Sequence, residues 1–286
     1  MARILRGKPV AEAILERTAA KVHELNDREI FPTLAIFRVG QKGADISYEK
    51  GAGKRCEETG VKVKHFTFDE NVEPEEFYRV LDEANRDPSI HGILVFRPLP
   101  KDRFRDEELR NRIAPEKDVD GCTDLSLAGI FTNKDLGFAP CTAQAVIEIL
   151  NHYGIGIRGK NVVVLGRSLV IGKPVAMMLL NRNATVTICH TRTVNAADIC
   201  SKAEILVCTT GQMEMVTRDY TNEKQTVIDV GIDWNEKKQK LCGDVLYDDV
   251  EPFVEDLTPV PGGVGSVTTS VLVSHVAEAA ERMNRK

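Results

Sequence analysis

The segment Val162–Pro174, with the sequence VVVLGRSLVIGKP, decides the fold that this chain is expected to adopt. Its first four residues are apolar and mostly β-branched, which is typical of a fully buried strand. Gly166 ends the strand, and a helix should follow with Pro174 in its first turn, where the missing N–H costs nothing. Such a turn cradles phosphate, because backbone N–H groups and the helix dipole attract an anion there. Gly166 and Gly172 would let the backbone approach the ligand closely.

Taken alone, this segment also fits an ordinary strand-to-helix turn, because its glycines do not have the spacing G-x-G-x-x-G. The residues after the next expected strand, 184–189, favour a dinucleotide. A site for NAD usually has an acid here to accept from the ribose 2′-hydroxyl. This chain has Thr191 and Arg192 instead, with Arg167 in the first turn, which favours the 2′-phosphate of NADP over NAD. The alternative for Arg192 is a solvated surface residue.

Further cofactor contacts are expected at the carboxyl ends of the neighbouring strands, since ligands bind there in open α/β sheets. The full set of predicted cofactor-binding residues is Gly166, Arg167, Ser168, Gly172, Thr191, Arg192, Thr210, Gly211, Gly231 and Ile232.

Composition limits the class of protein. A chain of 286 residues with 42% hydrophobic and 28% charged residues is typical of a soluble globular protein of two domains. The net charge of -5 argues against nucleic-acid binding. No apolar run approaches the ~20 residues of a membrane span, and no signal peptide is recognisable. The seven cysteines form no C-x-x-C pair, which predicts reduced, mostly buried thiols in a cytoplasmic protein without a metal site.

Strand and helix patterns alternate along the chain, and this order predicts an α/β fold with parallel sheets joined by right-handed crossovers. Residues 125–138 are expected to be irregular, and Thr142 is the expected N-cap of a helix over 143–153. Strands are expected at 33–40, 61–68, 91–96, 162–165, 184–189, 205–208 and 226–232; the other helices are expected at 9–25, 44–59, 74–84, 175–180, 194–202 and 267–282.

Several segments together resemble one family. They are GKPVA (7–11), the helix around Tyr48, GILV (92–95), KDVDG (117–121), PCT (140–142), GRS (166–168) with G-x-P (172–174), GDV (243–245) and TPVPGGVG (258–265). In this order they resemble the methylenetetrahydrofolate dehydrogenase/methenyltetrahydrofolate cyclohydrolase family, the FolD-type bifunctional enzymes. The resemblance spreads over nearly the whole chain.

The resemblance implies two α/β domains on either side of a cleft. Residues 1–140 plus 268–286 would form the folate-binding catalytic domain, on which the last helix packs. Residues 141–267 would form a Rossmann-like domain that binds NADP. The implied substrate is a small-molecule folate, with tetrahydrofolate as the one-carbon carrier, and homodimers are usual in the family.

The resemblance also assigns substrate contacts. Tyr48 matches the tyrosine that packs against the pterin, and Asp120 matches the acid that accepts hydrogen bonds from the pterin amino edge. Pro261, Gly262 and Gly263 are also expected to contact the substrate. Without the resemblance, Tyr48 would be a packing residue on an amphipathic helix and Asp120 a turn residue.

The chain departs from the family at two positions. The catalytic lysine of the family falls on Ala52, and the glutamine that supports it falls on Phe96. Lys54 follows Tyr48 by about 240° of helix rotation, so it should point away from the tyrosine. Since alanine cannot exchange a proton, we expect an NADP-dependent dehydrogenase whose cyclohydrolase activity is lost or weak.

Two alternatives stay open. In the first, the enzyme keeps both activities and uses Lys54 or Arg97 as a replacement group. In the second, the chain is a non-catalytic protein that senses a nucleotide or a folate.

Overall fold

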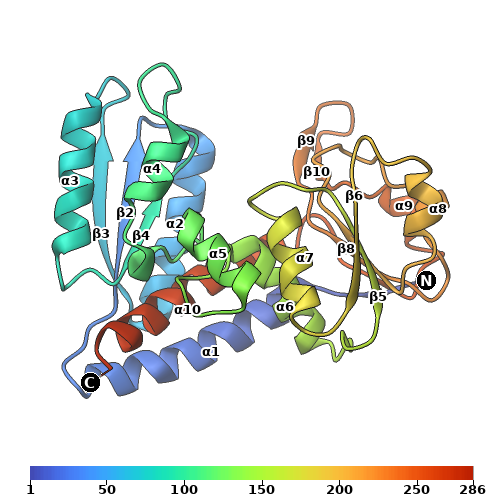
Figure 1. The fold of residues 1–286 in the computed structure, drawn as a ribbon, viewed down its shortest axis with the longest axis horizontal. Helices are drawn as coiled ribbons and strands as arrows, with labels where there is room; N and C mark the ends of the chain where they lie inside the picture. The colour runs from blue at the N-terminus through green and yellow to red at the C-terminus, as the bar shows by residue number, and fades with distance from the viewer. Residues whose placement is uncertain (286) are drawn as a thin grey trace. The chain divides into compact units, whose positions relative to one another are not determined.

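The structure is a computed structural model that describes residues 1–285, and the chain divides into two compact units. The first consists of Met1–Ala11 and Thr142–Thr268, and the second of Glu12–Cys141 with the chain from Thr269 onward. We call them the six-strand unit and the three-strand unit. Both are α/β units built on a parallel sheet, as predicted (Figure 1). Residues 1–11 group with the six-strand unit, because strand β1 (Arg3–Ile4) pairs with strand β11 (Asp256–Leu257).

The three-strand unit has the strand order β3-β2-β4, and all three strands are parallel. The strands are β2 (Thr33–Val39), β3 (Lys62–Phe68) and β4 (Gly92–Val95); the helices are α1 (Gly7–Asn26), α2 (Gly43–Thr59), α3 (Pro74–Arg86), α4 (Asp106–Arg112), α5 (Asp124–Thr132) and α10 (Gly265–Met283), with a 3-10 turn at Pro115–Lys117. One boundary between the units falls within α1, after Ala11, and another falls within α10, after Thr268.

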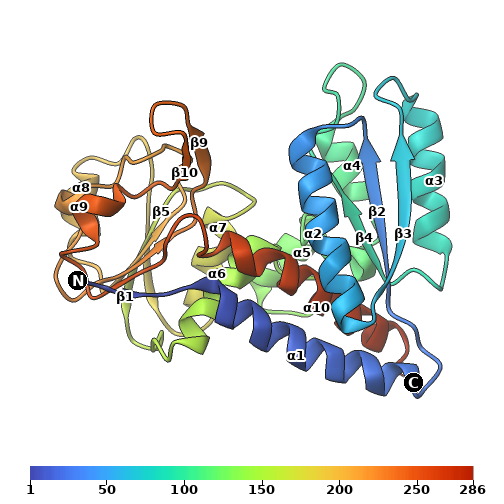
Figure 2. The same cartoon turned by 180° about the vertical axis from the view of Figure 1, so that it is seen from behind.

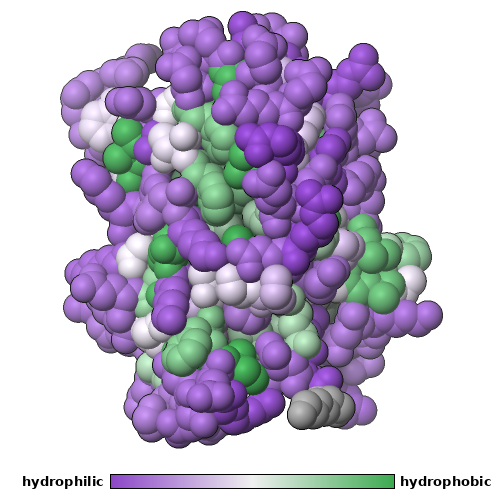
Figure 3. Space-filling model, turned by 90° about the vertical axis from the view of Figure 1, so that its left-hand side faces the viewer, coloured by the Kyte–Doolittle hydropathy of each residue, from purple (hydrophilic) through white to green (hydrophobic). Residues whose placement is uncertain are grey.

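Helices cover both faces of this sheet. On one face Phe37 packs with Phe77 of α3, and Leu109 of α4 belongs to the same core. Figure 1 shows α4 in front of the sheet, and Figure 2 shows α2 on the opposite side. The outer surface of α3 carries charged residues such as Glu76 and Arg79. Figure 3, which views the side with α3 and β3, accordingly shows a mostly hydrophilic surface.

The six-strand unit has the strand order β1-β11-β8-β7-β5-β6, all parallel, and a separate antiparallel pair, β9 with β10. Val162 of β5 pairs with Val186 of β6 on one side and with Ile205 of β7 on the other. The remaining elements are β5 (Asn161–Leu165), β6 (Thr185–Cys189), β7 (Ile205–Cys208), β8 (Thr226–Asp229), β9 (Asp233–Asn235), β10 (Lys240–Cys242), α6 (Cys141–His152), α7 (Gly172–Leu180), α8 (Ala196–Cys200) and α9 (Tyr247–Val250), with a 3-10 turn at Arg218–Tyr220.

Three local predictions are wrong. Helix α5 occupies much of the segment that was expected to be irregular; Thr123 caps it by accepting from the N–H of Ser126, and its apolar residues lie on all sides, so no helical period is visible. Thr142 is not an N-cap, because α6 already begins at Cys141. Strand β8 ends at Asp229, three residues earlier than expected, because the Asp229 side chain turns the following chain back.

Two findings concern the whole described chain. Within residues 1–285, no helix is long and apolar enough to cross a membrane. All seven cysteines are free thiols, and six of them are buried, which agrees with the sequence prediction.

Candidate functional site

The loop Lys117–Gly121 is held by its first two charged residues. Lys117 is buried, and its Nζ donates to the main-chain carbonyls of Ala84 at 3.0 Å and Asp87 at 2.7 Å. The fully buried Asp118 accepts from the Ser126 hydroxyl at 2.6 Å and from two main-chain N–H groups. Lys117 therefore anchors the loop to the end of α3, and Asp118 anchors it to α5.

The end of this loop packs tightly against the start of α6. Gly121 has a φ of 70°, and a Cβ there would collide with the main chain of Ala139 and Pro140, so only glycine fits. The carbonyl of Val119 accepts from Nδ1 of His275 at 2.8 Å and from the Cys141 thiol at 3.2 Å. Because its neighbours Val119 and Gly121 are fixed by these contacts, the backbone position of Asp120 is fixed as well.

Asp120 is the carboxylate that this loop presents, and its side chain is 29% exposed. The Arg97 guanidinium lies 3.8 Å from it, with Nη2 facing Oδ2. Burial raises the pKa of Asp120 to about 6; the Asp118 charge raises it further, whereas Arg97 and the Cys141 thiol oppose the rise. Near neutral pH, the fraction of Asp120 that is ionised therefore depends on the positive charge of Arg97.

Tyr48 and Phe96 lie close to this carboxylate. Their rings meet edge to face, with centroids 5.7 Å apart and planes at 86°. Burial raises the pKa of Tyr48 well above its usual value, and the nearby Asp120 acts in the same direction, so the phenol stays neutral. An aromatic ring, a second ring and an acid together suit a flat heterocycle with N–H donors.

The two positions on α2 after Tyr48 differ sharply. Ala52, one helical turn on, is fully buried. The Lys54 side chain is 74% exposed and lies 3.9 Å from Glu58. Lys54 therefore points to solvent, as the helix rotation predicted.

The six-strand unit contains a hollow of about 480 Å³ at the carboxyl ends of its strands. Gly166 stands at its edge with a φ of 133°, and its N–H donates to the carbonyl of Cys189 at 2.8 Å. The hollow is lined by Leu165, Gly166, Arg167, Ser168, His190, Thr191, Thr193, Ala196, Thr209, Thr210, Gln212, Met215 and Tyr220. Five of the predicted cofactor residues are among them: Gly166, Arg167, Ser168, Thr191 and Thr210.

The other five predicted residues do not line this hollow. Gly172 packs against the main chain of Gly166, where a Cβ would collide with the Gly166 carbonyl, so it shapes the loop. Gly231 packs in the same way against the Asp244 carboxylate. Arg192, Gly211 and Ile232 are the remaining three, and the Ile232 side chain is 58% exposed.

The N–H groups at the start of α7 are arranged differently from the expected open cradle. The Ser168 hydroxyl accepts from the N–H groups of Ile171 at 3.1 Å and Gly172 at 3.3 Å, and its carbonyl accepts from Lys173. These donors are used within the loop, because Ser168 lies four residues before the first residue of α7 and its oxygens accept from them. An anion would have to be bound by the rest of the loop and by Arg167.

Two buried acids that the sequence analysis missed hold the strand ends. Asp229 accepts from the N–H groups of Gly231, Asp244 and Val245, each at 3.0 Å. Asp244 in turn accepts from Thr210 N at 2.5 Å and Gly211 N at 3.3 Å. Burial raises the pKa of Asp229 to about 7. The signal was an acid at the end of the apolar strand TVID, since buried acids are rare without a partner.

The charge of the hollow suits a phosphorylated nucleotide. No residue in its lining, within the described part of the chain, is acidic, and Arg167, Thr191 and His190 all line it. Nδ1 of His190 accepts from the N–H of Arg192 at 3.2 Å, which places the proton of the neutral ring on Nε2, a donor. A 2′-phosphate would meet donors here, whereas NAD would find no carboxylate for its 2′-hydroxyl.

The remaining predicted substrate residues lie in the six-strand unit, on the loop that leads to α10. The N–H of Gly7 donates to the carbonyl of Gly262 at 2.8 Å, and a Cβ on Gly7 would collide with the carbonyl of Gly263. This close approach explains the glycine of the N-terminal GKPVA segment. The substrate contacts of Pro261, Gly262 and Gly263 stay predictions.

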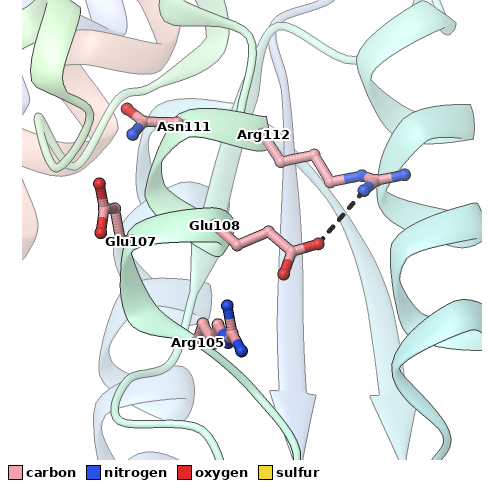
Figure 4. Close-up of a pocket in the computed structure, with 5 residues that line it drawn as sticks. All are labelled: Arg105, Glu107, Glu108, Asn111 and Arg112. Atoms are coloured by element: carbon pink, nitrogen blue, oxygen red, sulfur yellow. Dashed lines mark ion pairs between the residues drawn. The ribbon is translucent and has the colours of Figure 1, made fainter.

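A second hollow of about 480 Å³ lies along α4. Figure 4 shows its side chains, in which Glu108 pairs with Arg112 one turn later at 3.7 Å. Arg112 also pairs with Asp82 of α3 at 2.7 Å. Arg112 thus links α4 to α3 through its pair with Asp82.

Two family profiles match the chain. Residues 5–120 match the tetrahydrofolate dehydrogenase/cyclohydrolase catalytic domain, and residues 140–284 match the tetrahydrofolate dehydrogenase/cyclohydrolase NAD(P)-binding domain.

Curated relatives and solved structures agree with these profiles. The bifunctional protein FolD of Carboxydothermus hydrogenoformans is 48% identical to this chain over 285 residues, which cover 99% of each protein. The bifunctional protein FolD of Alkaliphilus oremlandii is 46% identical, and the match covers 98% of this chain and 97% of that protein. The crystal structure of the bifunctional enzyme FolD from Campylobacter jejuni superimposes with a TM-score of 0.94 at 34% identity, covering 99% of both chains. The Trypanosoma brucei enzyme, complexed with NADP and an inhibitor, gives 0.91 at 32% identity, covering 100% of this chain and 99% of its own.

Proposed function

The chain belongs to the tetrahydrofolate dehydrogenase/cyclohydrolase family, and on this premise we propose that it oxidises 5,10-methylenetetrahydrofolate to 5,10-methenyltetrahydrofolate with NADP. The proposal is supported by one feature of each unit: the acid-free hollow of the six-strand unit and the Tyr48–Asp120 group of the three-strand unit. We further propose that the enzyme is a homodimer.

Tyr48 and Asp120 of the three-strand unit each have a role in this proposal. Tyr48 packs against the pteridine ring, and the Asp120 carboxylate accepts hydrogen bonds from its amino edge. NADP, when bound, accepts the hydride that the folate releases. The protein's task is to hold the folate carbon in position, because the folate nitrogen lone pair expels the hydride and no protein base is required.

Cyclohydrolase activity is a second candidate function of the same site. The relatives that are 44–48% identical are called bifunctional, and this favours a bifunctional enzyme over the dehydrogenase alone that the sequence led us to expect. With alanine at 52 and Lys54 in solvent, the attack of water on the methenyl cation would rely on groups around Asp120. Arg97 cannot act as the base, because a guanidinium stays protonated.

Absorbance of the methenyl product and of NADPH tests both activities in one assay. We expect NADPH to form from methylenetetrahydrofolate, and methenyltetrahydrofolate to be hydrolysed faster than in buffer. The double variant Ala52→Lys/Phe96→Gln should raise hydrolysis by about tenfold, because it supplies a titratable amine and its hydrogen-bond partner. The single variant Phe96→Gln is the control and should not raise it. Absence of NADPH formation would contradict the dehydrogenase, and hydrolysis at the buffer rate would contradict the cyclohydrolase.

Cofactor preference gives a separate prediction. Replacing Arg167 by alanine should raise the KM for NADP by about tenfold and leave the KM for NAD nearly unchanged, because a charge-assisted contact to the 2′-phosphate is lost. Arg192→Ala is the matched control; since Arg192 does not line the hollow, its effect should be smaller. Steady-state kinetics with both dinucleotides measure this. Equal effects of Arg167→Ala on NADP and NAD would contradict the assignment.

A further inference from the structure

An arginine is held beside the substrate-facing carboxylate of the three-strand unit. The Arg97 side chain is only 18% exposed; its Nη1 lies 3.5 Å from Asp106 and its Nη2 lies 3.8 Å from Asp120. Burying a guanidinium is costly unless carboxylates compensate for the lost water. Arg97 thus depends on these two acids, and they depend on it.

The two acids are not equivalent partners. Asp106, at the start of α4, is 59% exposed and also pairs with Arg110 at 3.0 Å, so solvent and a second arginine share its charge. Asp120 is 29% exposed and has Arg97 as its paired cation among the described residues. The stronger mutual influence is therefore expected between Arg97 and Asp120, because less water screens that pair.

The other titratable groups around Asp120 do not replace this charge. Asp118 opposes ionisation of Asp120 by like-charge repulsion, and its carboxylate is occupied within the loop. The Cys141 thiol favours the carboxylate through a hydrogen bond, and Tyr48 is neutral. Burial raises the pKa of the Cys122 thiol well above its usual value, so this group is neutral too. Arg55 acts electrostatically on Tyr48, and its Nε donates to the Ser270 hydroxyl at 2.9 Å. Arg97 is the cation that pairs with Asp120.

We propose that Arg97 is a positioning residue for substrate binding: its guanidinium keeps Asp120 ionised and directed, so that the carboxylate accepts two N–H donors of the pteridine amino edge. This rests on the proposed function of Asp120. The arginine acts by charge alone, since it never releases its proton. It therefore supports binding of the folate without joining in proton transfer.

The expected effect depends on pH with a definite sign. An opposite charge within 4–6 Å lowers a carboxyl pKa by about 1–3 units. Without Arg97, the pKa of Asp120 should rise from about 6, so a larger fraction would be protonated at neutral pH. A protonated acid accepts fewer hydrogen bonds, and folate binding should weaken below the new pKa.

Arg97→Gln tests the proposal, because it removes the charge and keeps a polar side chain of similar length. We expect the KM for methylenetetrahydrofolate at pH 7 to rise about tenfold, with kcat changed less than about threefold. The acidic limb of the kcat/KM profile, near pH 6 in the wild type, should move up by about one unit. Arg97→Lys keeps the charge and should restore most of the affinity and the original limb.

Arg110→Gln is the matched control. Arg110 is equally buried, at 16% exposure, and it also pairs with Asp106, but its other partner is Asp124. It should leave KM and the acidic limb unchanged. A limb that stays in place in Arg97→Gln, or that moves equally in Arg110→Gln, would overturn the proposal.

A measurement without substrate separates this proposal from the proposed function. Carbon-13 NMR of aspartate carboxyl groups in the ligand-free protein, with Asp120 assigned by its loss in Asp120→Asn, reports the titration of Asp120 directly. We expect a higher midpoint in Arg97→Gln than in the wild type. An unchanged midpoint overturns the role of Arg97 even if the enzyme turns over, whereas a shifted midpoint in a protein without turnover refutes only the dehydrogenase assignment.

Discussion

Replacing Asp120 by asparagine should lower kcat/KM for methylenetetrahydrofolate by about 100-fold or more. Each hydrogen bond to a charged group contributes about 1.5–3 kcal/mol, and the carboxylate is proposed to accept two from the pteridine amino edge. Asparagine keeps the size but loses the charge and one acceptor, and its amide N–H groups would face the N–H donors of the substrate. Initial rates at saturating NADP, with varied folate, measure the effect.

The control for this variant is Asp106→Asn. Asp106 is the other carboxylate next to Arg97, but it is 59% exposed and lies at the start of α4. Its replacement should change kcat/KM less than about threefold. An Asp120→Asn enzyme with kcat/KM within threefold of the wild type would show that Asp120 does not contact the substrate.

Replacing Gly166 by alanine should lower the affinity for NADP at least about 100-fold. Gly166 has a φ of 133°, which side chains rarely adopt, and a Cβ would collide with the hydroxyl and carbonyl oxygens of Thr209. The turn after β5 must then move, and the edge of the hollow moves with it. Titration of NADPH fluorescence measures the affinity, and a thermal unfolding scan shows whether the unit still folds.

Gly211→Ala separates backbone strain from collision. Gly211 also has a positive φ, 63°, but nothing lies within 4 Å of an added Cβ. Its replacement should cost only the strain of a left-handed residue, about 1–2 kcal/mol, and lower NADP affinity less than tenfold. Equal losses in the two variants would mean that the collision with Thr209 is unimportant.

Local patterns in the sequence were sufficient for most of the fold. The apolar run 162–165 with Gly166 predicted β5 and its turn, and Gly60 correctly ended α2, because these signals depend on neighbouring residues only. The sequence analysis missed helix α5 because the helix's own apolar residues lie on all of its sides, so that no period of 3.6 can be detected. One of them, Phe131, is 74% exposed. The short strand β1 was missed because two residues carry no pattern.

By itself, the sequence determined the α/β class and, through its motifs, the family, since both are read from residue identity and order. Only the tertiary structure decided which charges meet. It places Arg97 beside Asp120 across 23 positions of sequence, and it connects Asp229 through Asp244 to the loop at Thr210. These relations depend on distance and burial, which act between segments far apart in the chain and leave no local pattern.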